Sequence, residues 1–275
     1  MRYFSFAIPF WGLAAFATAS SCCCKAAKQC PVTNVSPLRN TGDPVGKTEV
    51  FENVTMYCTG EEKYAGGTAV LFLTDIYGLA SPEDLRLADS FGRAGYLVVA
   101  PDLFNGSPSP LDMNAPGFNQ TQFLAAHGPE VTDPIVAKGI RYLREVRGAQ
   151  RVAVTGYCFG GRYALRFAGN ITAGENQGVD AAFAAHPAGW TDEEIEAINL
   201  PASVAQGQYD ELNPQALRQE MEDILDNKTT PWQMDLYSGA MHGFAVRPNI
   251  TVPQQRFAYE TSFIQAVRWF EFWSK

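Results

Sequence analysis

The stretch that decides the fold is RVAVTGYCFGGRYAL, residues 151–165. It runs from a short apolar strand pattern, through a glycine-rich turn around Cys158, into a helical pattern. Strand, sharp turn and helix in this order are the context of a nucleophile elbow. The turn is so tight that its neighbours must be small, which explains Gly156 and Gly160 on the two sides of the cysteine. The alternative, a structural cysteine in a glycine-rich turn, fits the strand–helix placement less well.

The elbow also predicts where the sulfur of Cys158 lies. It should stand above the sheet edge, at the N-terminus of the helix that follows. The positive end of that helix favours a thiolate and stabilises an oxyanion. We therefore predict that Cys158 is a nucleophile.

A nucleophile needs a base, and the chain contains three histidines. In a sheet of this type the partners follow the order nucleophile, acid, histidine. His242 comes after the last predicted strand, residues 232–237, and is the predicted base. His186 ends a strand and either lines the site without being the base or is a satisfied buried imidazole. His127 lies in a polar loop and is expected to be solvated.

The acid that orients the base should follow a strand between Cys158 and His242. Asp210 does so, directly after the predicted strand 202–207, and its neighbour Glu211 remains an alternative. Asp235 falls inside a strand and is a weaker candidate. Three further acids are interpreted as a solvated helix start: Asp192, Glu193 and Glu194.

Strand-like and helix-like runs alternate along the chain, which predicts an α/β fold with a mostly parallel central sheet and helices on both faces. Residues 103–132 are loop-like and long enough to cover a site. The predicted strands are 68–74, 96–100, 151–155, 179–185, 202–207 and 232–237; the predicted helices are 82–94, 133–147, 161–169, one starting at 213, and 253–273.

Composition limits the classes of function. The 275 residues are 46% hydrophobic and 18% charged, which fits one folded domain and excludes a disordered chain. The net charge is −8 and no basic run occurs, so nucleic acid and anionic membrane surfaces are poor partners.

The N-terminus has the pattern of a secretory signal peptide over residues 1–19. Arg2 precedes an apolar stretch, and the small residues 17–19 offer a cleavage site. The apolar stretch has about 15 residues, short of the roughly 20 that a bilayer core requires, which disfavours a membrane anchor. We predict a secreted protein with a cysteine-rich segment over 20–49 and a folded domain over 50–275.

Glycosylation sequons support the secretory pathway. Seven of the twelve asparagines fit Asn-x-Ser/Thr, where composition alone predicts about one. They are Asn34, Asn53, Asn105, Asn119, Asn170, Asn227 and Asn249.

Five of the six cysteines precede the first strong strand: Cys22, Cys23, Cys24, Cys30 and Cys58. In an oxidising compartment they should form one or two disulfides, and their odd number leaves at least one unpaired. We expect Cys58 to pair with one of the others, and Cys30 is favoured because the closed loop contributes roughly 3–4 kcal/mol. A zinc site lacks the spaced pairs of ligands that it needs, so no metal is expected.

Six separated motifs resemble the dienelactone hydrolase family of α/β-hydrolases, its fungal branch most closely, over about residues 50–275. They are TDIYGL (74–79), APDLF (100–104), GYCFGGRYA (156–164), AAHPAG (184–189), GQYDELNP (207–214) and MHGFAVRP (241–248).

The resemblance implies a catalytic triad of Cys158, Asp210 and His242. It implies an oxyanion hole made by the backbone N–H groups of Ile76 and Phe159. Two departures stand out. Asp75 replaces a glutamate that bacterial members carry near the nucleophile. Residues 105–107, Asn-Gly-Ser, stand where a substrate-binding arginine is expected.

The predicted function is hydrolysis of small carboxylic esters or lactones through an acyl-enzyme, with no metal or organic cofactor. The alternative is a non-hydrolytic cyclisation, acyl transfer or elimination at the same site in natural-product biosynthesis. A catalytically idle binding protein is the third class, and the intact order of Cys, Asp and His argues against it.

Overall fold

The computed structural model describes residues 37–61, 64, 66–169 and 178–274. The predicted signal peptide, Cys30, Asn34 and Asn170 lie outside the described residues. Within the described ranges, no helix combines the length and the apolar character that crossing a bilayer requires.

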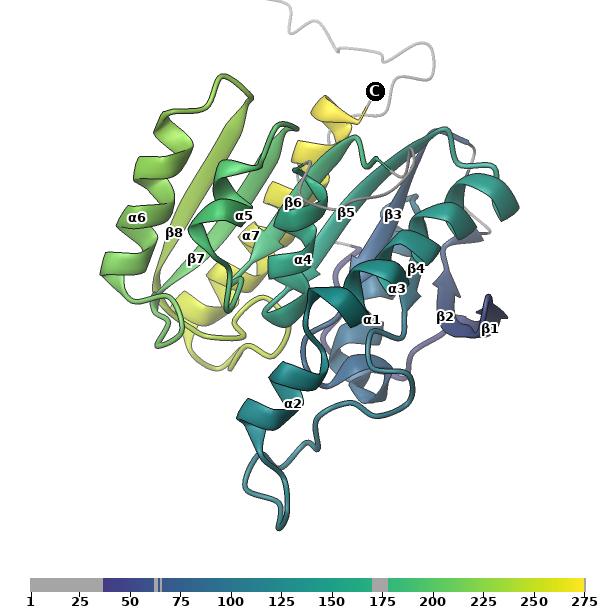
Figure 1. Ribbon diagram of the computed structural model, residues 1–275, viewed down its shortest axis with the longest axis horizontal. Coiled ribbons are helices and arrows are strands. Elements are labelled where there is room, and N and C mark those ends of the chain that lie inside the picture. The colour runs from purple at the N-terminus through teal and green to yellow at the C-terminus, as the bar shows by residue number, and fades with distance from the viewer. Residues whose placement is uncertain (1–36, 62–63, 65, 170–177, 275) are drawn as a thin grey trace, which may run out of the picture. The chain divides into compact units, whose positions relative to one another are not determined.

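An eight-stranded sheet forms the centre of the fold (Figure 1). Its strand order is β1-β2-β4-β3-β5-β6-β7-β8, with β3 to β8 parallel and β1 and β2 antiparallel to their neighbours. This confirms the predicted α/β fold with a mostly parallel sheet. The strands are β1 (Lys47–Phe51), β2 (Val54–Thr59), β3 (Thr68–Leu73), β4 (Leu97–Pro101), β5 (Arg151–Tyr157), β6 (Ala181–Ala185), β7 (Ala202–Tyr209) and β8 (Trp232–Met241).

Helices cover both faces of the sheet (Figure 1). The α-helices are α1 (Pro82–Arg93), α2 (Gln120–Ala126), α3 (Pro129–Arg141), α4 (Phe159–Phe167), α5 (Asp192–Glu196), α6 (Gln215–Asp226) and α7 (Pro253–Trp273). A short 3-10 turn, η2 (Gly78–Ala80), precedes α1, and a π-helical turn, η3 (Tyr142–Val146), follows α3.

The strands are buried on both sides, so the sheet separates two hydrophobic cores. One core packs α1 and α7 on the sheet, and Phe91 of α1 meets Phe263 of α7 with ring centroids 4.9 Å apart. The other core packs α3, α4, α5 and α6 on the opposite face, with Tyr163 of α4 fully buried. Because both faces are covered, the carboxyl edge of the parallel strands is where functional loops gather.

Three boundaries differ from the sequence prediction. The chain joins the fold before residue 50: β1 begins at Lys47, and the Val45 N–H donates to Asp89 of α1 at 2.9 Å. The expected loop 103–132 contains α2, and Pro129 starts α3 early because proline suits a first helical turn. Strand β8 continues to Met241 because it keeps pairing with β7.

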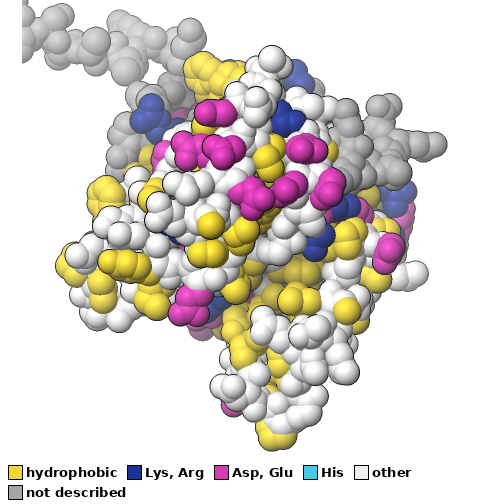
Figure 2. Space-filling model, turned by 60° about the vertical axis from the view of Figure 1, so that its left-hand side comes forward, with side chains coloured by type: hydrophobic (Ala, Val, Ile, Leu, Met, Phe, Trp, Pro, Cys, Tyr) yellow, Lys and Arg dark blue, Asp and Glu magenta, His cyan; other side chains and the backbone are white. Residues whose placement is uncertain are grey.

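Acidic side chains gather on the face that α6 presents (Figure 2). A groove between α5 and α6 is lined by Asp192, Glu196, Glu220 and Asp223, with Lys228 beside them.

Candidate active site

Cys158 lies at a strained turn between β5 and α4. Its backbone has φ 51° and ψ −112°, a conformation that L-residues avoid and that nucleophile elbows impose. The flanking glycines are required by close approach. A Cβ on Gly156 would overlap the carbonyl of Gly160, and one on Gly160 would overlap the carbonyl of Leu73. The predicted elbow is therefore present in the structure.

His242 and Asp210 meet at the carboxyl edge of the sheet. Asp210 follows β7 and His242 follows β8, and Nδ1 of the imidazole lies 2.9 Å and 3.0 Å from the two carboxylate oxygens. Since a carboxylate only accepts, the ring donates this hydrogen bond. Asp210 is buried and also accepts from the Leu212 N–H at 2.9 Å, whereas Glu211 is exposed. The structure thus brings Asp210, and not Glu211, to the histidine.

The other edge of the His242 ring is available to the cysteine. Its Nε2 atom is buried and forms no hydrogen bond of normal geometry with a described residue. Burial lowers the pKa of His242, but the hydrogen bond to Asp210, the nearby Cys158 sulfur and the charges of both groups raise it to about 10. A protonated imidazole beside Cys158 places a positive charge next to the sulfur, as a cysteine nucleophile requires.

Two backbone N–H groups are candidates for an oxyanion hole. Phe159 is the first residue of α4, so its N–H has no carbonyl partner within that helix. Ile76 follows Asp75, whose carboxylate accepts from the Tyr77 N–H at 2.8 Å and so fixes the turn. The Ile76 carbonyl accepts from the Ser109 N–H at 2.9 Å, which ties the loop after β4 to this turn.

An ionic cluster that the sequence did not reveal, with its two carboxylates buried, supports this turn. Arg247 donates to the Asp75 carboxylate, lies 3.6 Å from Asp84, and stacks over Tyr77 at 4.7 Å. Burial first, and then the charge of Asp75, raises the pKa of Asp84 well above its ordinary value. Arg247 lies within MHGFAVRP and Asp84 at a helix start, so the only sequence signal was their nearness to motif residues.

A sequence model of the dienelactone hydrolase family matches residues 55–273. The chain belongs to this family. It is a hydrolase of the dienelactone hydrolase type.

Two fungal relatives show how far this similarity extends. The chain is 39% identical to the hydrolase pyvD of Aspergillus violaceofuscus over 229 residues, covering 83% of this chain and 91% of the relative. It is 32% identical to the hydrolase tropI of Talaromyces stipitatus over 247 residues, covering 86% and 94%. A crystal structure of a putative dienelactone hydrolase from Klebsiella pneumoniae shares the fold, with a TM-score of 0.63 at 19% identity over 79% of this chain and 92% of that one.

The two remaining histidines of this dienelactone hydrolase family member differ in environment. His186 is fully buried, with φ 39°, and neither ring nitrogen has a hydrogen-bond partner among the described residues. It is buried, but no described residue satisfies its nitrogens with hydrogen bonds as the second interpretation expected, and its ring lies beside that of His242. His127 caps α2 and is half-buried, not solvated, because its Nδ1 lies 2.8 Å from the Phe123 carbonyl and its ring packs on Phe104.

The expectation that Glu194 is solvated is wrong. It was interpreted as part of a solvated helix start, but it is buried and binds Arg162 at 2.7 Å and Arg166 at 2.5 Å. The acid run has the local pattern of an exposed helix terminus, and only packing of α5 on α4 buries it. Asp235 lies on β8, where the Gln233 amide donates to it at 3.0 Å, and it does not reach His242.

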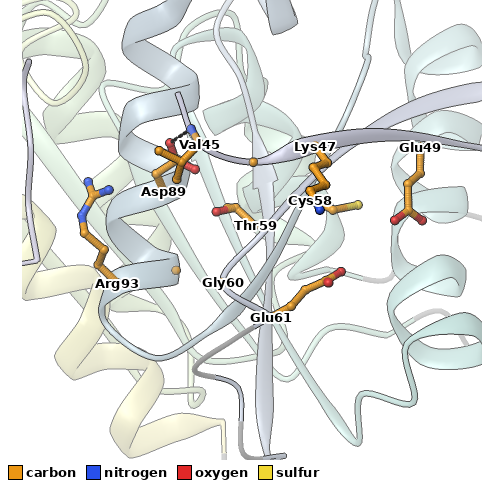
Figure 3. Close-up of a pocket in the computed structure, with 11 residues that line it drawn as sticks. Val45, Lys47, Glu49, Cys58, Thr59, Gly60, Glu61, Asp89 and Arg93 are labelled. Carbon is orange, nitrogen blue, oxygen red and sulfur yellow. Dashed lines mark hydrogen bonds between the residues drawn. The ribbon is translucent and has the colours of Figure 1, made fainter. Parts of the chain in front are cut away.

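A second pocket contains Cys58 (Figure 3). It lies between helix α1 and the paired start of β1 and end of β2, and charges of both signs line it, including Asp89 and Arg93. The Cys58 thiol is buried and has no disulfide partner among the described residues, and burial raises its pKa to about 11. Its expected partner Cys30 lies outside the described residues, so the structure shows no bridge and the pairing stays a prediction.

No group of three or more side chains suited to a metal occurs in the described part of the chain. The sequon asparagines within that part share exposure to solvent: Asn53, Asn105, Asn119, Asn227 and Asn249. Exposure is what glycosylation requires, and attachment of a glycan at any of the seven stays a prediction.

Proposed function

We propose that the enzyme hydrolyses carboxylic esters or lactones through Cys158, His242 and Asp210. The observation that supports this most is the placement of His242. Its Nδ1 is held by Asp210, and Cys158 is near enough to raise the pKa of its ring. A base held by an acid on one side and facing a nucleophile on the other is the arrangement of a covalent hydrolase.

In the first step the thiolate sulfur of Cys158 attacks the acyl carbon, and the carbonyl electron pair moves onto oxygen. The N–H groups of Ile76 and Phe159 donate to this oxyanion. As the intermediate collapses, the bond from carbon to the leaving alkoxy oxygen breaks. Protonated His242 gives that oxygen its proton.

In the second step water attacks the thioester, and neutral His242 takes a proton from the water. The C–S bond then breaks and restores the thiolate beside the imidazolium, while Asp210 keeps the ring oriented. One ester and one water give one acid and one alcohol. A lactone gives both groups on one product, and neither step uses a metal ion or organic cofactor.

An uncharged substrate fits this proposal better than an anionic one. Arg247 is the cation beside the predicted oxyanion turn, and the carboxylates of Asp75 and Asp84 already face it. The loop after β4 carries residues 105–107 without an arginine. Neutral aryl esters and simple lactones are therefore the substrates to test first.

The test is the Cys158→Ala variant assayed on a short p-nitrophenyl ester. We expect hydrolysis to fall by at least roughly 10³-fold while the melting temperature stays near that of the wild type. Cys58→Ala is the matched control, since Cys58 lies in the second pocket beside β1 and β2, and it should keep its activity. Full turnover in Cys158→Ala would refute the assignment of the nucleophile.

Products formed in H₂¹⁸O separate hydrolysis from cyclisation or acyl transfer at the same site. Hydrolysis places one solvent oxygen in the product acid, because water cleaves the acyl-enzyme. A product without ¹⁸O, formed by a Cys158-dependent reaction, would favour the non-hydrolytic alternative.

We also propose that the enzyme enters the secretory pathway. The signal-peptide pattern over residues 1–19 and the solvent exposure of the described sequons support this. Protein expressed in a fungal host should lose mass on treatment with an N-glycosidase, and less so after Asn227→Gln. Intact residues 1–19 and no mass loss would contradict the proposal.

A further inference from the structure

The backbone around His186 is fixed by the ends of neighbouring strands. His186 follows β6 with φ 39°, a conformation that asparagine and histidine tolerate better than most residues. Its N–H donates to the Ala205 carbonyl of β7 at 2.8 Å. The carbonyl of the next residue accepts from Asn213 at 2.5 Å, and the Ala188 N–H donates to the Cys158 carbonyl at 3.0 Å. The direction in which the imidazole leaves the chain is thus set by β5, β6 and β7.

The ring of His186 is enclosed by aromatic rings. Its centroid lies 5.0 Å from that of His242, with an interplanar angle of 69°, and 5.3 Å from that of Phe244. The ring centroid of Tyr157 of β5 lies 6.2 Å away. Since no described polar group hydrogen-bonds to the His186 nitrogens, packing alone holds this ring.

The hydrogen bond to Asp210 does not by itself fix the orientation of the His242 ring. Asp210 grips His242 at one atom, Nδ1, and a ring held at one atom can still swing about that contact. We propose that His186 is a positioning residue for His242: its ring stops this swing and keeps Nε2 directed at Cys158. The inference rests on the proposed function, because it assigns His242 the role of base.

A positioning residue at this point must also be uncharged, because a second cation would disfavour protonated His242. Burial first, and then the charges of His242 and Arg247, lower the pKa of His186 well below its ordinary value. The titratable groups around the two rings come from every neighbouring element. They are Tyr157 and Cys158 at the elbow, Asp210 after β7, Arg247 after β8, Asp75 and Asp84 beside Arg247, and Tyr259 of α7 beside Tyr157.

Two substitutions separate the ring from the backbone. His186→Asn suits the positive φ but deletes the ring, so we expect kcat to fall roughly 10–100-fold with little change in KM. His186→Phe keeps a ring but is strained at this φ, so it should lower the melting temperature while kcat per folded molecule stays within about threefold of wild type. If His186 had only a structural role, activity would follow stability in both variants, and His186→Phe would lose more activity than His186→Asn.

A second readout does not depend on turnover. The rate at which iodoacetamide alkylates Cys158 is measured between about pH 6 and pH 10, since only the thiolate reacts. The wild type and His186→Phe should give the same rate profile. In His186→Asn the neutral-pH rate should fall severalfold. His127→Asn is the matched control and should leave both readouts unchanged.

The outcomes distinguish this inference from the proposed function. If the wild type hydrolyses esters and His186→Asn matches it in kcat and in alkylation, the positioning role is overturned and the hydrolase remains. If no ester is hydrolysed, the alkylation profiles still decide whether His186 positions His242. If folded His186→Phe loses activity like His186→Asn, the imidazole itself is needed and positioning by packing is wrong.

Discussion

Two groups of polar side chains lie along helix α4. They differ in how many of their buried polar atoms form hydrogen bonds. In the body of the helix, Arg162 and Arg166 meet Glu194 of α5 and Asp133 of α3. The hydrogen bonds of this paired cluster range from 2.5 to 3.1 Å. Burial lowers the pKa of Arg166, but hydrogen bonds to Asp133 and Glu194 and their charges raise it.

At the N-terminal end of α4, around Cys158, pairing is incomplete. Buried polar atoms without a hydrogen-bond partner in the described structure include Nε2 of His242, both ring nitrogens of His186 and one carboxylate oxygen of Asp84. An unpaired buried polar atom costs stability. The comparison indicates that the paired cluster holds helices together and that the incompletely paired edge is free to react.

The largest effect is expected from a substitution in the elbow turn, which joins β5 to α4 at the incompletely paired edge. In Gly160→Ala a Cβ would overlap the Leu73 and Thr74 carbonyls, so the elbow cannot close. We expect a loss of several kcal/mol of stability, measured by urea unfolding, and no detectable ester turnover. Gly178→Ala is the control, because open space surrounds that glycine. A stable and active Gly160→Ala enzyme would show that the turn is not tight.

The paired cluster should respond in stability alone. Glu194→Gln removes the charge that faces two arginines, and breaking a buried pair in this way should cost about 3 kcal/mol. Activity per folded molecule should not change, because Glu194 touches none of the triad. Glu193→Gln, on the exposed side of the same helix, should leave the melting temperature unchanged. A Glu194→Gln enzyme with wild-type stability would show that the paired cluster does not hold the helices together.

The incompletely paired edge should respond in activity. Asp210→Asn preserves size but offers His242 an amide, which favours the wrong tautomer, so we expect kcat to fall roughly 10²-fold. Melting should shift little by comparison with Glu194→Gln. Glu211→Gln is the adjacent control; if it lost more activity than Asp210→Asn, Glu211 would be the orienting acid.

The same variant makes a prediction about pH. Although burial lowers the pKa of His242, Asp210 and Cys158 raise it to about 10, so the imidazolium persists through neutral pH in the wild type. Removing the Asp210 charge lowers this pKa, and the imidazolium is then lost as pH rises through a lower value. Alkylation of Cys158 by iodoacetamide should become pH-dependent near neutrality in Asp210→Asn. An unchanged profile would mean that Asp210 does not set the charge of His242.

The parts of the site that sequence predicted are those set by local chain pattern. Cys158, Asp210 and His242 each follow a strand, and parallel strands bring their carboxyl ends to one edge. Gly156 and Gly160 were predicted for a similar reason, since a sharp turn has the same steric requirement wherever it occurs.

The parts that sequence did not predict depend on contacts between distant segments. Arg247 binds Asp75, which is 172 residues away in the sequence, and no local pattern predicts that pair. Glu194 has the local pattern of an exposed helix start, and its burial depends on how α5 packs against α4. His186 could be placed at a strand end, but its lack of hydrogen-bond partners follows from the rings around it.

The smallest effect is expected from Asp84→Asn, which makes the same acid-to-amide change as Glu194→Gln but at the incompletely paired edge. Asp84 accepts from the Asp75 N–H at 3.1 Å through one oxygen, which an asparagine carbonyl can replace. Its other oxygen lies 3.6 Å from Arg247, which Asp75 continues to neutralise. Asp84→Asn should therefore be tolerated, whereas Glu194→Gln is not.

The sign of its pH dependence follows from the raised pKa of Asp84, which burial and the charge of Asp75 cause. Because the folded state holds this proton more tightly than the unfolded chain, wild-type stability falls as pH rises from the ordinary carboxyl range towards the raised pKa. Asp84→Asn lacks this loss, so its free energy of unfolding should gain on the wild type as pH rises through that window. Urea unfolding at several pH values measures the difference, with half-exposed Glu83→Gln as control. If Asp84→Asn instead lost stability relative to wild type with rising pH, Asp84 would be a paired carboxylate like Glu194.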